Sequence, residues 1–77
     1  MTQKEWQKKF SEKLTTILRD RGMKQSRLAE QSGLSDSRIS DYIKMRSVPT
    51  IFAVMNMAYA LDVNISDLVD FDERVYN

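Results

Sequence analysis

A single glycine near the middle of the chain constrains the fold more than any other residue. Gly33 separates two short segments, residues 25–32 and 36–44, in which apolar side chains recur at the spacing of an α-helix. Glycine adopts a left-handed backbone at little cost, so Gly33 can end the first helix and turn the chain directly into the second. Ala29 is small enough for the second helix to cross closely, and Leu34 fills the space between the two. The spacing therefore predicts two helices that cross at about 90–120°, with the second standing out from the surface.

The same periodicity predicts helices in the rest of the chain. A T-x-x-E capping box at residues 2–5 opens a helix expected over residues 3–21. Thr50 is the expected cap of a further helix over residues 51–61, and Asn64 caps a last short one. We expect the core stripe of the helix over residues 51–61 to consist of Ile51, Val54, Ala58 and Leu61. No strand pattern interrupts these segments, so the prediction is an all-α domain.

The composition excludes several classes of protein. The chain of 77 residues makes one small domain and contains neither cysteine nor histidine, which removes disulfides, the usual zinc ligands, histidine bases and cysteine nucleophiles. A group of acids could be imagined as a cation site but lacks the spacing and turn glycine of an EF-hand: Asp67, Asp70, Asp72 and Glu73. No apolar run is long enough to span a bilayer, and the amino terminus lacks the apolar stretch of a signal peptide. We therefore expect a cytoplasmic protein that does not associate with a membrane and is not an enzyme.

Positive and negative charges are divided unevenly along the chain. Residues 1–49 contain 11 Lys or Arg against 6 Asp or Glu, whereas residues 50–77 contain 1 against 5. A basic half joined to an acidic half favours one face for a polyanion and another face for a different contact. The alternative is a solvated surface with a chance asymmetry, and the charges alone do not decide between the two.

The middle of the chain carries a specific pattern of residue types. Its members are Gln25-x-x-Leu28-Ala29-x-x-x-Gly33-Leu34-Ser35-x-x-x-Ile39-Ser40-x-Tyr42. With Pro49 and the segment ALDVNISDLV behind it, this pattern resembles the helix-turn-helix family of phage repressors and Cro-like regulators over about residues 14–69. The resemblance implies a compact five-helix, lambda-repressor-like DNA-binding domain over residues 1–77, with the helix-turn-helix at 25–44 and a tail at 71–77.

One residue departs from the pattern of the family. Met45 stands where the family usually has glycine after the third helix. Two outcomes are open, a third helix that runs on slightly or a strained turn at Met45. Either outcome would change the contacts of the loop that follows.

In that family the third helix lies in the major groove with its amino-terminal part against base edges. Transferred by position, the resemblance implies five base-facing residues: Asp36, Ser37, Arg38, Ser40 and Asp41. Ser37 and Arg38 are the stronger candidates, because serine can contact a base or a phosphate and arginine a guanine or a phosphate. Both acids could accept a hydrogen bond from cytosine N4. Each also has a role within the protein, since Asp36 favours the helix dipole and Asp41 lies three residues from both Arg38 and Lys44.

Residues around the third helix are expected to contact phosphates. Gln25 resembles the family's phosphate-contacting glutamine, at a helix end whose N–H groups suit a phosphate oxygen. The full expected set is Gln25, Ser26, Ser35, Lys44, Arg46 and Thr50. Ser35 and Thr50 are also the expected caps of the helices that follow them.

A second surface is expected on the helix over residues 51–61. Phe52, Met55 or Asn56, and Tyr59 share one side of it, which would face solvent in a monomer. With Val69 and Phe71 nearby in sequence, we expect this side to pair two copies of the chain, which places two third helices about 34–36 Å apart on a pseudo-palindromic operator. The alternative is that Phe52 and Tyr59 fold back over the core or against Trp6.

Two functions remain open on these grounds. The first is a sequence-specific, double-stranded-DNA-binding transcriptional regulator, a repressor of the phage or mobile-element type that acts by occupying a promoter. It implies no cofactor, and no small-molecule ligand is evident. The second is a protein-interaction module, such as an antitoxin or an antirepressor target, which uses the surface around Phe52 and Tyr59.

Overall fold

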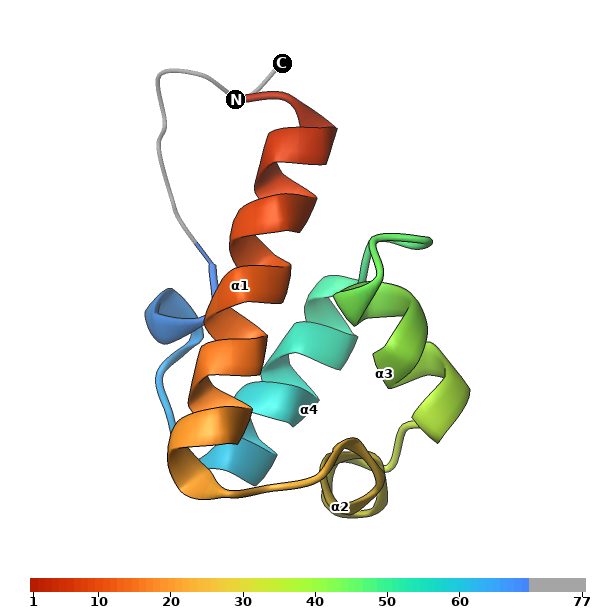
Figure 1. Cartoon of the computed structure of the whole chain (residues 1–77), viewed down its shortest axis with the longest axis vertical. Coiled ribbons are helices and arrows are strands. Elements are labelled where there is room, and N and C mark those ends of the chain that lie inside the picture. Colours follow the sequence, from red (N-terminus) through yellow and green to blue (C-terminus); the bar gives the residue numbers. More distant parts are fainter. Residues whose placement is uncertain (70–77) are drawn as a thin grey trace.

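The computed structural model describes residues 1–69 of the chain as four α-helices followed by one 3-10 turn (Figure 1). The elements are α1 (Gln3–Arg21), α2 (Gln25–Ser32), α3 (Asp36–Ile43), α4 (Ile51–Leu61) and the 3-10 helix η1 (Ile65–Asp67). The all-α class is confirmed. The count of five helices is wrong, because the segment after Asn64 completes only a single 3-10 turn.

Local chemistry sets where the helices begin and end. The hydroxyl oxygens of Thr2, Ser35 and Thr50 accept hydrogen bonds from backbone N–H groups in the first turns of α1, α3 and α4. Gly22 and Gly33 end α1 and α2 with left-handed φ angles of 61° and 74°. The sequence-based bounds of these helices are therefore confirmed to within one residue.

The core lies where the helices meet. α2 packs against both α3 and α4, and α1 packs against α3. Figure 1 shows α1 as the long helix along one side of the molecule, α3 on the opposite side of the view and α2 below them. Ala29 and Ile39 are both buried, in agreement with a close crossing of α2 and α3. Helices as short as α2 and α3 are not stable alone, so the helix-turn-helix is stabilised by packing against α1 and α4.

The expected core stripe of α4 is wrong at one position. Ile51 is 64% exposed, whereas Val54, Ala58 and Leu61 are buried as expected and are joined by Ala53 and Met57. α4 is apolar around most of its circumference and carries no charged residue, so periodicity alone does not single out the buried side. Ile51 therefore belongs to an exposed surface and not to the core.

Candidate nucleic-acid interface

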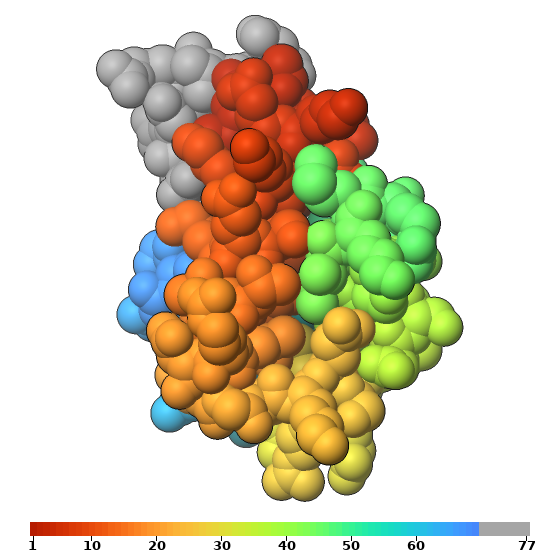
Figure 2. Space-filling view, viewed as in Figure 1, coloured from red at the N-terminus to blue at the C-terminus, as the bar shows by residue number. Residues whose placement is uncertain are grey.

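The third helix divides its residues between the core and solvent. Ile39 is 0% exposed and Tyr42 4% exposed, and they hold the inner side of α3. The base-facing candidates Asp36, Ser37 and Arg38 are exposed in its first turn, while Ser40 and Asp41 are partly exposed in the next. Figure 2 shows the surface of α3 and its following turn, in green, beside α1 along one flank of the molecule. The five candidates thus all lie on α3 and all reach solvent.

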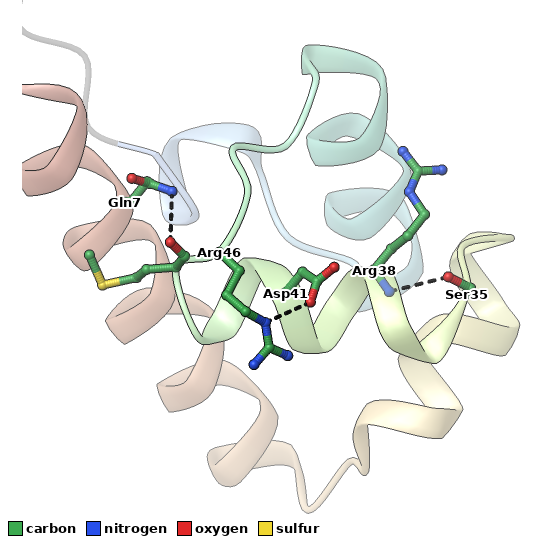
Figure 3. Close-up of polar contacts among 6 residues, drawn as sticks. Gln7, Ser35, Arg38, Asp41 and Arg46 are labelled. Carbon is green, nitrogen blue, oxygen red and sulfur yellow. Dashed lines mark hydrogen bonds and ion pairs between the residues drawn. The ribbon is translucent and has the colours of Figure 1, made fainter.

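The turn before α3 keeps polar groups at the surface. The hydroxyl of Ser35 accepts a hydrogen bond from the Arg38 N–H at 3.2 Å, which leaves the hydroxyl proton of Ser35 able to donate (Figure 3). Thr50 has the same arrangement at the start of α4, where its hydroxyl accepts from the Ala53 N–H at 3.0 Å. Both residues are exposed. Each therefore combines a structural cap with a free donor.

The start of α2 differs from the starts of the other three α-helices. Its N-cap position is Lys24, which makes no side-chain capping hydrogen bond. No side-chain oxygen therefore occupies the first N–H groups of α2, although the Arg27 N–H donates to the Lys24 carbonyl at 3.0 Å, and the exposed Lys24 adds a positive charge beside this helix end. Gln25 is partly exposed and Ser26 is exposed at the same end. Sequence reasoning missed Lys24, although a basic residue directly before Gln25 was a usable signal.

The chain leaves α3 through a left-handed turn at Met45, whose φ is 63°. The Met45 N–H donates to the Tyr42 carbonyl at 3.2 Å, and the Arg46 N–H donates to the Asp41 carbonyl at 2.8 Å. These two bonds form a Schellman motif, a common helix ending in which glycine usually supplies the left-handed residue. Of the two outcomes left open for Met45, the strained turn is confirmed and the longer helix is wrong.

Two side chains from α1 hold this end of α3 in place. The Gln7 Nε2 donates to the Met45 carbonyl at 3.3 Å, and the Ser11 hydroxyl donates to the Ile43 carbonyl at 2.6 Å. Gln7 is one of the buried polar residues of the molecule, and Figure 3 shows it reaching the turn from α1. The Ser11 bond satisfies a carbonyl that the end of α3 leaves without an intrahelical partner, and the Gln7 bond satisfies one in the turn that follows. No local signal could reveal them, because the partners lie 38 and 32 residues apart in sequence.

The carboxylate of Asp41 has a partner within the protein. Arg46 Nε lies 2.9 Å from Asp41 Oδ1, so the charge partner of Asp41 is Arg46 and not the expected Arg38 or Lys44. In Figure 3 the guanidinium of Arg46 folds back to Asp41, while Arg38 extends away from this pair. Asp41 and Arg46, expected to act separately on a base and a phosphate, are thus brought together at one end of α3.

The sequence of the chain matches a known family over most of its length. Residues 13–74 match the family of the Cro/C1-type HTH DNA-binding domain. The chain belongs to this family. Members of it are DNA-binding regulators and not enzymes, so the expected class of protein is confirmed.

Solved structures of regulators share the fold of this Cro/C1-type domain. The restriction-modification controller protein C.AhdI from Aeromonas hydrophila is 26% identical, with a TM-score of 0.78, over 80% of this chain and 94% of that one. The SOS-response transcriptional repressor LexA from Eubacterium rectale is 22% identical (TM-score 0.80) over 100% of this chain and 82% of that one. A transcriptional regulator from Listeria innocua is 24% identical (TM-score 0.71) over 88% and 64%. The latter two bear on the fold alone. No curated protein matches the chain.

The Cro/C1-type domain carries a second exposed surface along α4. Within residues 1–69, all the exposed large hydrophobic residues fall between positions 48 and 59: Val48, Ile51, Phe52, Met55 and Tyr59. Their spacing places them on one side of α4 and of the turn before it. We call these five residues the apolar stripe. Tyr59 is 88% exposed and Phe52 69%, so neither folds back over the core, and Trp6 stacks instead on Phe10 with ring centroids 5.3 Å apart.

The remaining members of the expected partner surface have different outcomes. Val69 is 6% exposed and belongs to the core, so its assignment to that surface is wrong. The reason is that Leu68 and Val69, directly after η1, pack back into the core, which sequence proximity to Phe71 does not reveal. Asn56 is only partly exposed, and Met55 takes the place in the apolar stripe. Phe71 and the tail at 71–77 lie outside the described residues.

Two further features of residues 1–69 bear on other kinds of site. No helix among them has the length and apolar character needed to cross a membrane. In the same part of the chain, no three acidic side chains lie close enough together to hold a metal ion.

Proposed function

We propose that this Cro/C1-type domain is a sequence-specific transcriptional regulator that binds double-stranded DNA as a homodimer, with α3 of each copy in the major groove. The observation that carries the proposal is the division of α3. Asp36, Ser37 and Arg38 are exposed in its first turn, while Ile39 is buried beneath them. Polar side chains at the start of a helix that stands on an apolar anchor suit contacts with base edges.

The base-reading roles follow from donor and acceptor chemistry. Arg38 would donate two hydrogen bonds to guanine O6 and N7, and Ser37 would contact a base or a phosphate. Asp36 would accept from cytosine N4, and Ser40 would contact the next base along the groove. Asp41 was expected in this set, but its carboxylate is paired with Arg46.

Phosphate contacts would flank the base-reading residues on both sides. At the start of α2, Gln25 and Ser26 lie beside N–H groups that no side chain caps, a site suited to a phosphate oxygen. At the start of α3 the free hydroxyl proton of Ser35 would reach the backbone, and beyond the other end of the helix the ammonium of the exposed Lys44 and the hydroxyl proton of Thr50 would do so. These contacts carry no sequence information, but they hold α3 in register.

The apolar stripe supports pairing of two copies. The helix α4 contains no Lys, Arg, Asp or Glu, so two copies could meet there without burying an unpaired charge. In a twofold contact each copy would supply the same residues, with Phe52, Met55 and Tyr59 at the centre. Such a dimer would suit a pseudo-palindromic operator with half-sites about 34–36 Å apart.

The regulator would act by occupancy as a repressor of the phage or mobile-element type. Bound across a promoter, the dimer excludes polymerase, and no chemical step is needed. The likeness to a restriction-modification controller protein supports a regulatory role for a domain of this size. The assignment as a repressor rests on the resemblance of the helix-turn-helix pattern to that of phage repressors.

The apolar stripe also favours a second candidate function, a protein-interaction module of the antitoxin or antirepressor-target kind. In that case Phe52→Ala or Tyr59→Ala would abolish function while Arg38→Ala would not. The regulator predicts that Arg38→Ala alters DNA recognition. A functional assay of these variants side by side therefore separates the two candidates.

In vitro selection of bound duplexes tests the leading proposal. We expect one enriched pseudo-palindromic sequence. The logarithm of its binding constant should fall linearly with the logarithm of the salt concentration. The slope should be near −0.9 per phosphate contact, or roughly −4 to −6 for a dimer. If no sequence is enriched over random duplex, the proposal is wrong.

A further inference from the structure

The end of α3 carries an ion pair in an unusual place. In a Schellman motif, a hydrophobic contact commonly joins the residue after the left-handed position to the third residue from the helix end. Here those two positions are Arg46 and Asp41, which are joined by a backbone hydrogen bond of 2.8 Å and by the ion pair of 2.9 Å. Arg46 is therefore held to Asp41 at two points, one on the backbone and one on the side chain.

We propose that Asp41 is a positioning residue, whose carboxylate holds Arg46 so that the free edge of its guanidinium meets a DNA phosphate. This inference rests on the proposed function and deepens it. It replaces base reading as the role of Asp41 and gives the acid a reason to lie on a DNA-facing helix.

The donor inventory of arginine supports this assignment. A guanidinium has five N–H groups in one plane, and the contact with Asp41 uses the group on Nε. The two terminal nitrogens keep an edge with parallel N–H groups, which matches two oxygens of a phosphate. The side chains of Arg46 and Asp41 are 57% and 41% exposed, so a phosphate can reach that edge without displacing the carboxylate.

The charges also favour the pair over an isolated acid. A bare carboxylate at the groove would repel phosphates, whereas the Asp41–Arg46 pair is neutral and presents its cationic side outward. The backbone bond at Arg46 and the Gln7 bond at Met45 hold the turn, and the ion pair with Asp41 holds the Arg46 side chain, so less side-chain freedom is lost when a phosphate binds.

A double-mutant cycle tests the proposal on the selected duplex. We expect Arg46→Ala to weaken binding about tenfold or more and to flatten the salt slope by about 0.9 for each half-site. Asp41→Asn should weaken binding about 3- to 10-fold, equally for the selected duplex and for its single-base variants, and should have no such effect in the Arg46→Ala background. Asp36→Asn is the matched comparison, since its effect should be the same with and without Arg46. Asp62→Asn, which removes one charge at the far end of α4, controls for net charge.

Three results would overturn the inference while the proposed function stands. Asp41→Asn could bind all duplexes more tightly, which would make the carboxylate a simple repulsive charge. It could change the base preferred at one position, which would make Asp41 a base reader. It could also weaken binding equally in the Arg46→Ala background. A wild-type protein that binds no selected duplex would instead overturn the proposed function and this inference together.

Two further measurements keep the test independent of folding and of DNA. Met45→Gly relieves the left-handed strain of the turn, so Asp41→Asn can be repeated in that background if the single variant unfolds. The loss of affinity should persist there. In the free protein, the Arg46 Nε–H proton should exchange with water slowly, as measured by nitrogen-15 NMR. Asp41→Asn should raise that exchange rate. A rapidly exchanging signal in the wild type would contradict the pairing itself.

Discussion

The exposed sides of α3 and α4 differ in kind, although the two helices follow one another in the chain. The outer side of α3 is polar and carries acids, serines and arginine, whereas the outer side of α4 is apolar and α4 has no charged residue. Polar side chains on α3 are well solvated by water. The apolar side chains on α4 are not, because exposed apolar area carries a free-energy cost unless a partner covers it. The domain thus exposes two surfaces of different chemistry, which the proposed function assigns to DNA and to a second copy, and losing one should have a different experimental signature from losing the other.

The largest effect should come from placing a charge in the apolar stripe. Phe52→Glu would put two like charges into a twofold contact, and operator affinity should fall about 100-fold, since each copy would then bind its half-site alone. The fold should survive, because Phe52 is exposed. Sedimentation and operator binding would measure both results. Thr16→Glu, an exposed position on α1, is the matched control for the added charge. If Phe52→Glu leaves a dimer at micromolar concentration, the pairing surface lies elsewhere.

On the outer side of α3, loss of a side chain should change base preference and leave the association of two copies unchanged. Arg38→Ala should cost about 1–3 kcal/mol of binding free energy at one base position and relax the preference there. Lys44→Ala is the control on the same helix end, expected to weaken all sequences alike and to flatten the salt slope by about 1 per half-site. Repeating the selection with each variant distinguishes them, and a uniform loss for Arg38→Ala would make it a phosphate contact.

The caps offer a comparison of stability between the two helices. Ser35→Ala and Thr50→Ala each remove a hydroxyl that accepts from an N–H in the first turn, and each should lower the free energy of unfolding by about 1 kcal/mol. If these hydroxyls also donate to phosphates, both variants should in addition weaken DNA binding. Thermal unfolding and salt-dependent binding would separate the two contributions. A variant that loses stability without losing affinity would be a cap only.

The smallest effect should appear where α3 and α4 end. Both helices are followed by a left-handed residue other than glycine, Met45 with φ 63° and Asp62 with φ 55°. Met45→Gly should raise the free energy of unfolding by about 0.5 kcal/mol, because relief of about 1–2 kcal/mol of strain exceeds the entropic cost of glycine. Asp62→Gly should gain less, since aspartate tolerates this conformation better than methionine. Equal gains in denaturant unfolding would argue against strain at Met45.

Features that depend on neighbouring residues could be predicted from the sequence, and features that depend on distant ones could not. The starts of α1, α3 and α4 follow from Thr2, Ser35 and Thr50, whose hydroxyls act within the same turn. The outer side of α3 was predictable for the same reason, since the helical spacing of the apolar Ile39 and Tyr42 determines which residues face solvent. The exposure of Ile51 was missed because an apolar, uncharged helix gives periodicity little contrast. The ending at Met45 stayed open because its supports, Gln7 and Ser11, belong to a different helix.

The attachment of α3 to α1 has a consequence for engineering new specificity. Gln7 and Ser11 hold the Met45 and Ile43 carbonyls at the end of α3, so under the proposed function the angle at which α3 enters a groove would depend on two side chains of α1. Transplanting only the outer residues of α3 into a relative without a matching amide and hydroxyl would transfer the side chains but not the orientation of the helix that carries them. Chimeras of this domain should therefore exchange α1 and α3 together.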